Sequence, residues 1–418
     1  MIHRGFSGWL LLLLTAFAAA AAEPAADDHL RRTAEAGDAD AAVRLGSDYF
    51  NGNNGRQRNL TAAAYWFRRA AQQKHPEGHY RFAFCLDHGY GVSRDRATAF
   101  EEYSRAAAAG ITDAAVRRAE ILFDGLAPGF DPGSPGITAD PAAAGAILRE
   151  CAAQDHPVAM RLLAVFALRQ PAGKRDDAQI ETRLRRAAEL GDTPAKRILG
   201  ERLLASADRR ERQRGADLLT AAGDAGDAAA LTRLGIVREQ GLAEAPPDEE
   251  AAFACFRRAA EMGDAAARIH LAGYMWRGSV VRQNIPEAIK LYRAGAAAGH
   301  PLAQYMLGQA MLKGIGTEPD AAGGAEWLQR AAANGENEAQ LLLASLYENG
   351  RHLPSDPAAA VYWYRRAAEL GSRDGMREFG LRLLRGRGIT ADPAAARAIL
   401  RRAAGMGDAV SADLLKNL

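Results

Sequence analysis

Nine histidines and three cysteines are the side chains of this chain with the widest range of chemistry. His75 and His79 lie four positions apart, a spacing that can place two metal ligands on one helix face. Pro76 separates them at the start of a predicted helix, so they are not expected to share a face. His75, His156 and His300 instead recur at one position of a repeated pattern, which indicates a role in the fold.

Motifs that would support catalysis are missing from the sequence. It contains no His-Glu-x-x-His, no Cys-x-x-Cys, no phosphate loop ending in Gly-Lys-Ser/Thr and no Ser-x-x-Lys. Gly89-Tyr90-Gly91 resembles part of a nucleotide-binding loop, but it follows a predicted helix rather than a strand. Acidic pairs such as Glu101-Glu102 lie near helix starts, where their negative charge interacts favourably with the positive end of the helix dipole. The sequence therefore predicts no catalytic residue, no metal site and no cofactor.

The three cysteines, Cys85, Cys151 and Cys255, belong to different copies of the repeated pattern. Packed helices lie about 8–10 Å apart, whereas a disulfide needs Cα atoms within about 7 Å. We therefore expect three unpaired thiols that act as small packing residues.

A segment of about 36 residues recurs ten times between Ala39 and Asp408, which is the mark of a solenoid. In the copy 301–336, Ala303 and Leu307 share one helical face and Gly314 ends that helix. Asp320 then caps a second helix, so the unit is helix, glycine-rich turn, helix, short turn. The small residue at the start of the first helix is Ala41, Gly78, Ala114, Ala159, Ala195, Ala230, Ala267, Ala303, Ala339 or Gly375.

Two segments carry a family resemblance most clearly. Tyr65-Trp66-Phe67-Arg68-Arg69-Ala70-Ala71 and Tyr362-Trp363-Tyr364-Arg365-Arg366-Ala367-Ala368 look like the second helix of a Sel1-like repeat, which is similar to tetratricopeptide repeats. The resemblance implies an all-α, right-handed α-solenoid of about ten helix-turn-helix repeats with capping helices. The expected domains are a signal peptide (1–22), an N-terminal capping half-repeat (23–38), ten repeats (39–408) and a C-terminal capping helix (409–418).

The N-terminus predicts export. Arg4 supplies a positive charge, Trp9 to Phe17 is apolar, and Ala18 to Ala22 offers small residues for cleavage. The apolar stretch is too short for a comfortable membrane span, and the mature chain has none of membrane length. We therefore expect a periplasmic or secreted protein.

Departures from the repeat are places where function is expected. Residues 127–135 form a Pro/Gly-rich insertion in which Phe130 is a possible contact, the alternative being a tolerated surface loop. The fourth and fifth repeats lose the glycine turn and carry Arg161 and Arg197 at a usually apolar position. This change predicts a bend in the array, a basic patch for an acidic partner, or sequence drift. Arg118 occupies a core position, so we expect its head to reach solvent or to pair with Glu120 or Asp124.

The first helices of such arrays usually line the concave side, and this face is the expected partner surface. Aromatic residues with polar neighbours there suit a peptide or helix. For Trp276 the alternative is packing under the next repeat. The predicted contacts on this face are Tyr80, Phe84, Ile269, Trp276, Tyr305 and Gln309.

The net charge of +2 does not indicate that the protein binds nucleic acid. The resemblance implies an exported, non-catalytic and monomeric scaffold or regulator that binds a protein or peptide partner in the bacterial cell envelope. The alternative is an enzyme, or a module regulating one, that acts on cell-wall material, because some Sel1-like proteins have been called β-lactamases.

Overall fold

The computed structural model describes residues 25–126, 136–241 and 246–416, so the predicted leader and Phe130 lie outside it. Its elements are twenty-two α-helices and one short 3-10 turn, Ala172–Lys174. The helices are α2 (Ala25–Glu35), α3 (Ala39–Asn51), α4 (Leu60–Gln72), α5 (Pro76–His88), α6 (Arg96–Ala108), α7 (Thr112–Asp124), α8 (Pro141–Ala153), α9 (Pro157–Leu168), α10 (Asp177–Glu189), α11 (Thr193–Leu204), α12 (Arg209–Asp224), α13 (Ala228–Gln240), α14 (Glu249–Glu261), α15 (Ala265–Arg277), α16 (Ile285–Ala297), α17 (Pro301–Lys313), α18 (Ala321–Ala333), α19 (Asn337–Asn349), α20 (Pro357–Glu369), α21 (Arg373–Arg385), α22 (Pro393–Gly405) and α23 (Ala409–Lys416).

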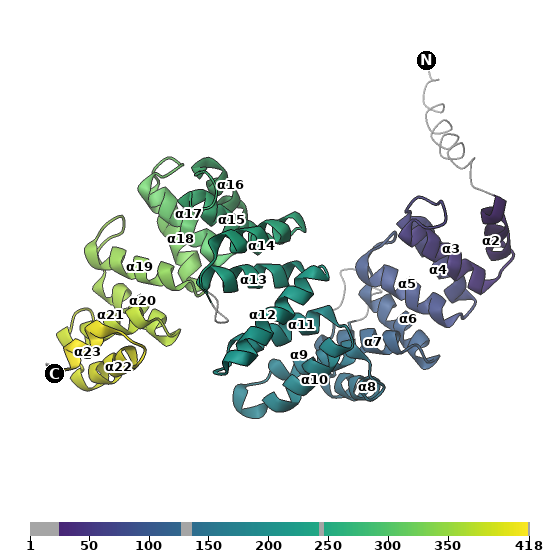
Figure 1. The fold of residues 1–418 in the computed structure, drawn as a ribbon, viewed down its shortest axis with the longest axis horizontal. Helices are drawn as coiled ribbons and strands as arrows, with labels where there is room; N and C mark the ends of the chain where they lie inside the picture. The colour runs from purple at the N-terminus through teal and green to yellow at the C-terminus, as the bar shows by residue number, and fades with distance from the viewer. Residues whose placement is uncertain (1–24, 127–135, 242–245, 417–418) are drawn as a thin grey trace, which may run out of the picture. The chain divides into compact units, whose positions relative to one another are not determined.

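The predicted all-α solenoid is confirmed. Odd-numbered helices from α3 to α21 are first helices of the repeats, and even-numbered helices from α4 to α22 are second helices. Helices that follow one another in the sequence pack together from α2 to α10 and again from α12 to α23 (Figure 1). The chain divides into two compact units, one up to Lys196 and one from Arg197, with the boundary inside α11. None of the described helices combines the length and apolar character that a membrane span requires.

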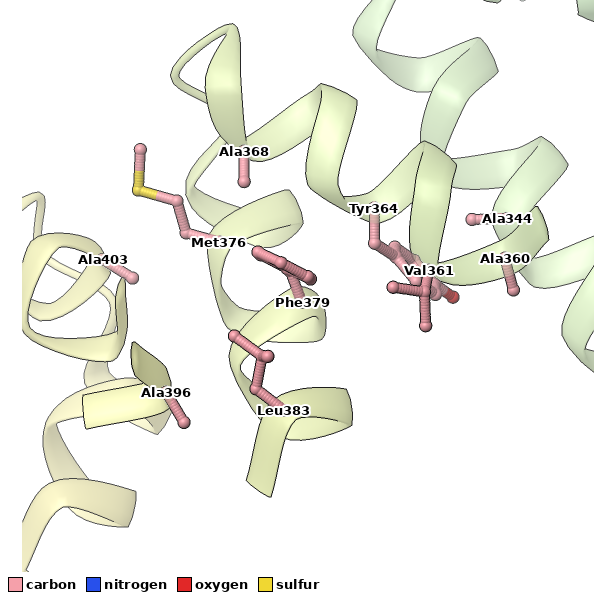
Figure 2. Close-up of a cluster of buried hydrophobic side chains, with 10 residues drawn as sticks. All are labelled: Ala344, Ala360, Val361, Tyr364, Ala368, Met376, Phe379, Leu383, Ala396 and Ala403. Atoms are coloured by element: carbon pink, nitrogen blue, oxygen red, sulfur yellow. The ribbon is translucent and has the colours of Figure 1, made fainter. Parts of the chain in front are cut away.

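Glycine and alanine on the first helices allow large side chains of the second helices to enter the core. A Cβ on Gly46 would lie 2.6 Å from the ring of Phe67, and one on Gly235 would lie 2.6 Å from the ring of Phe256. Figure 2 shows the converse arrangement near the C-terminus, where large side chains of the first helix α21, such as Phe379, lie among alanines of the second helices α20 and α22. The hydrophobic core is therefore a row of small clusters, as expected for a solenoid.

The Gly-x-Gly turns join one repeat to the previous one. Gly89 caps α5 in the left-handed conformation, with φ of 73°. Gly91, with φ of 71°, lies so close to the start of α4 that a Cβ would be 2.1 Å from the carbonyl oxygen of Leu60. Gly388 lies in the same way against Pro357 at the start of α20. Packing between repeats thus explains the glycine pattern that resembled a nucleotide loop.

The fourth and fifth repeats keep both helices although they lack the glycine turn. After Gln170, the 3-10 turn Ala172–Lys174 connects α9 to α10. The hydroxyl of Ser206 accepts a hydrogen bond of 3.1 Å from the backbone N–H of Asp208, the residue that caps α12. The loss of glycine has therefore changed the connections and left the helix pairs in place.

Candidate partner-binding surfaces

The aromatic residues predicted on the first-helix side are largely occupied with packing. Tyr80 is half-buried 6.0 Å from the ring of Tyr103, and burial raises the pKa of its phenol. Phe84 lies 6.2 Å from Phe50 in an aromatic group that also includes Tyr90. The hollow that Phe84 helps to line holds only about 20 Å³, which is little more than the space for one water molecule.

The remaining residues predicted on this side lie in the second unit, and one of these predictions is wrong. Ile269 is only 2% exposed and packs in a core cluster with Tyr292, so it cannot contact a partner. Trp276 is half-buried with its ring 6.2 Å from Tyr292, so it packs on the second helix of its own repeat. Tyr305 is half-buried beside a core cluster and accepts a hydrogen bond of 3.2 Å from Gln309. Tyr305 and Gln309 therefore keep part of their surface open.

Arg161 and Arg197 form contacts between repeats. Arg161 donates to the carboxylate of Asp192 at 2.9 and 3.2 Å, and Arg197 donates to Asp227 at 3.1 Å. Each aspartate also accepts from a backbone N–H in the first turn of the next first helix. The guanidinium groups are thus engaged inside the protein, which argues against a basic patch at these positions.

The same contact recurs in other repeats with other side chains. The hydroxyl of Thr232 donates to Asp264 at 3.0 Å, and Arg377 donates to Asp408 at 2.9 Å. We call this recurring pair the aspartate clamp: a side chain of one first helix bound to the aspartate that caps the next first helix. The clamp gives Arg161 and Arg197 a structural role without any external partner.

Larger hollows lie on the second-helix side. Groove 1 holds about 580 Å³ between α4 and α6, with α5 as its floor. Groove 2 holds about 320 Å³ between α6 and α8, with α7 as its floor. In the second unit, groove 3 holds about 480 Å³ and is lined by α12, α13 and α14 together with the segment before α14. Groove 1 is lined by Arg68, Gln72, His79, Phe82, Leu86, Glu102 and Arg105, among others.

One position on the second helices holds tryptophan in the first and ninth repeats but not at these grooves. In the first repeat, Trp66 is 6% exposed and packs with residues of α2 and α3, so it fills the space between α2 and α4. Trp363 packs in the corresponding way beside α19. The position holds Glu102 at groove 1, Ile147 at groove 2 and Cys255 at groove 3. At all three grooves, this position therefore lacks the tryptophan that fills the space in the first repeat.

Groove 1 contains a buried polar pair. A hydrogen bond of 2.5 Å joins Nδ1 of His79 to Oε2 of Glu102, and both residues are less than 10% exposed. Arg105 donates to the other oxygen, Oε1, of the same carboxylate. A buried carboxylate is tolerated only when it is paired, and here it has two partners. This arrangement preorganises His79 and Glu102 at the bottom of the groove.

This pair was not predicted from the sequence, because the spacing of His75 and His79 pointed only to a possible metal site for His79. The signal was a double change from the first repeat, in which Ala42 and Trp66 occupy the positions of His79 and Glu102. Such a matched change can be found by aligning the repeats position by position. By contrast, His75 and His156 cap α5 and α9, as their recurrence predicted.

Arg118 lines groove 2. The predicted ion pair is not formed, because Glu120 pairs with Arg117 at 3.0 Å and Asp124 pairs with Arg169 at 2.6 Å. Its guanidinium carbon lies 5.8 Å from the ring centre of Phe100. Its Nε atom has no hydrogen-bond partner among the described residues. The side chain therefore lines groove 2 while its Nε atom stays buried, so the predicted ion pair is wrong and part of the guanidinium group lies away from solvent.

The three cysteines are free and buried, as predicted. Burial raises the pKa of the Cys85 thiol to about 12, and it also raises the pKa of Cys151 and Cys255. Since the thiolate is the nucleophile, we expect iodoacetamide at about pH 8 to alkylate the native protein more than tenfold more slowly than the urea-unfolded protein. Mass spectrometry of timed samples measures this ratio, and rapid alkylation of native Cys85 would contradict its burial. Within the described residues, no group of three or more His, Cys, Asp or Glu side chains is placed to hold a metal ion.

Comparison with known proteins gives matches over most of the chain. The Sel1 repeat family model matches seven segments that together cover more than half of the sequence. The third to fifth helix pairs, residues 112–227, lie outside these segments. The matched segments are 39–75, 76–111, 228–264, 265–300, 301–336, 337–372 and 374–408.

Solved structures with similar folds include c5321, a protective antigen present in uropathogenic Escherichia coli strains. It is 26% identical, with a TM-score of 0.55, and the match covers 93% of this chain and 81% of that one. A Sel1 repeat protein from Oxalobacter formigenes is 22% identical over 93% of this chain and 90% of its own, with a TM-score of 0.38. Among curated proteins, DAP3-binding cell death enhancer 1 of Rattus norvegicus is 38% identical over 90 residues. These are 22% of this chain and only 17% of that relative.

Proposed function

Because the chain belongs to the Sel1 repeat family, whose repeats are protein-interaction scaffolds, we propose that it is an exported, non-catalytic scaffold or regulator of the bacterial cell envelope. It acts as a monomer and binds a protein or peptide partner on the second-helix side of its first unit, through groove 1 and the neighbouring groove 2. This surface replaces the first-helix side, which the sequence had favoured.

The observation that carries this proposal is the replacement of the tryptophan that fills the equivalent space in other repeats. A groove of about 580 Å³ is within the size range of binding sites, whereas the hollow beside Phe84 is about 20 Å³. Groove 1 combines an apolar floor, which includes Phe82 and Leu86, with charged side chains at its edge. An apolar centre with a polar rim is typical of interaction surfaces.

Site-specific photocrosslinking in intact cells tests which side binds. A benzophenone amino acid at Gln72, which is exposed at the edge of groove 1, is expected to capture one envelope protein. The same group at Arg44, which is exposed on the first helix α3, is the matched control. Capture from Arg44 and none from Gln72 would contradict the proposed surface.

The proposed export depends on residues 1–22. The description of c5321 as a protective antigen supports an exposed location for a protein of this kind. Removing residues 2–22 is expected to leave the protein in the cytoplasmic fraction, measured by immunoblotting beside a periplasmic and a cytoplasmic marker. Export of the shortened chain would show that these residues are not the signal.

One observation favours an enzyme acting on cell-wall material as a second candidate. The carboxylate of Glu102 orients the imidazole of His79, as in a general base. If this pair were catalytic, purified protein would hydrolyse peptidoglycan or a β-lactam, and His79→Gln would remove that activity. We expect no hydrolysis above the buffer rate for either protein, because a scaffold requires the pair only for the shape of the groove.

A further inference from the structure

The edge of groove 1 carries a positive charge that the protein does not neutralise. Arg68, on the exposed side of α4, has no hydrogen bond or ion pair among the described residues. Arg68 therefore offers a charged hydrogen-bond donor to a group that enters the groove.

The acidic groups of the groove do not cancel this charge, because both are engaged. The carboxylate of Glu102 is bound by His79 and by Arg105. Asp95 caps α6, where it accepts hydrogen bonds from the backbone N–H and the hydroxyl of Thr98 at 3.0 and 2.6 Å. The guanidinium group of Arg68 is therefore available to bind an anion.

The apolar floor of the groove determines which kind of side chain the ligand must carry beside the anionic group. Phe82, Leu86 and Val92 present apolar side chains beneath the edge that carries Arg68. Phe82 and Val92 are only partly buried against the neighbouring core clusters, so part of their apolar surface is open. A ligand that covers this floor must carry a large apolar side chain.

We propose that groove 1 binds a segment of the partner protein in which a carboxylate stands next to a large apolar residue. The carboxylate lies on Arg68, and the apolar side chain lies on Phe82 and Leu86. The shared chemistry is the carboxylate, which either an Asp or Glu side chain or a C-terminus supplies. The proposal rests on the proposed scaffold function and names the chemistry of its partner.

Random heptapeptides displayed on phage test this chemistry without knowledge of the natural partner. One library displays the peptides internally, and a second ends in a free C-terminus. Selection on the mature protein is expected to enrich Asp or Glu beside Phe, Leu, Ile or Met in the internal library. If only the C-terminal library gives binders, the carboxylate is that of a chain end.

Charge reversal then locates the binding site. Arg68→Glu is expected to weaken the selected peptides by more than about tenfold, the size expected for the loss of a charge-assisted hydrogen bond. The control is Arg401→Glu, which makes the same change at the equivalent exposed position of the tenth repeat and should alter affinity by less than about twofold. Fluorescence polarisation with labelled synthetic peptides measures both.

Enrichment of peptides without acidic residues, no enrichment at all, or full binding to the Arg68→Glu variant would each overturn the inference. Photocrosslinking from Gln72 separates this failure from failure of the proposed function. If the envelope protein is still captured there, the scaffold proposal stands and only the ligand chemistry is wrong. If nothing is captured, both proposals fall.

Discussion

Replacing Gly91 by alanine is expected to lower the free energy of unfolding by about 2–5 kcal/mol. Alanine at the left-handed φ of 71° costs about 1–2 kcal/mol. The new methyl group would also lie 2.1 Å from the carbonyl oxygen and 2.5 Å from the backbone nitrogen of the Leu60–Thr61 peptide. Because these are backbone atoms at the start of α4, the turn must move away from the previous repeat, which adds about 1–3 kcal/mol.

Gly110→Ala provides the matched control for this change. Gly110 also has a positive φ, 92°, but a Cβ there would meet nothing within 4 Å. We expect it to cost only about 1–2 kcal/mol, the conformational part of the effect. Urea unfolding followed by circular dichroism measures both variants. Equal losses for the two would mean that Gly91 does not hold the repeats together.

Asp192→Ala is expected to cost about 2–4 kcal/mol, because Asp192 makes both parts of the aspartate clamp. Its carboxylate is only 4% exposed and accepts a hydrogen bond of 2.7 Å from the backbone N–H of Ala195. Such a capping hydrogen bond is worth about 1 kcal/mol. It also pairs with Arg161 at 2.9 Å, and hydrogen bonds to charged groups are worth about 1.5–3 kcal/mol. Removal of the carboxylate leaves Arg161 half-buried without this partner.

Asp176→Ala isolates the capping part of that effect. Asp176 caps α10 through the backbone N–H of Gln179 at 3.0 Å, in an exposed position and outside any aspartate clamp. Its loss should cost about 1 kcal/mol. A double-mutant cycle that combines Arg161→Leu with Asp192→Ala measures the coupling directly. A coupling energy near zero would show that the clamp contributes nothing to the contact between repeats.

The repeat fold follows from the sequence because packing and turns obey the same period. The small residue of each first helix, the glycine that follows most of these helices and the aspartate or asparagine before each second helix fix the helix pairs locally. Even residues 112–227, which the family model leaves unmatched, form helix pairs, since their helix caps and apolar stripes remain. Little long-range information is needed for such a fold.

The partner surface could not be predicted in the same way. Helical period shows which residues share a face, but it does not show whether the next repeat covers that face. Ile269, Arg161 and Thr232 share one repeat position; Ile269 is buried there, while Arg161 and Thr232 bind an aspartate of the next repeat. The groove was missed because it depends on a side chain that is absent, the tryptophan replaced by Glu102.

The central claim is that the partner occupies groove 1, and filling the groove tests it most directly. His79→Ala combined with Glu102→Trp copies the pair that closes the space in the first repeat, Ala42 and Trp66. The matched control places the same two side chains in the tenth repeat, as Met376→Ala with Ile399→Trp. Both variants are expected to keep the helical circular dichroism signal.

The decisive measurement is the yield of the crosslinked partner from a benzophenone at Gln72 in these two backgrounds. Filling groove 1 is expected to lower the yield by more than about tenfold, the factor that corresponds to about 1.4 kcal/mol. The tenth-repeat variant should give the wild-type yield. An undiminished yield from a folded protein with groove 1 filled would contradict the account.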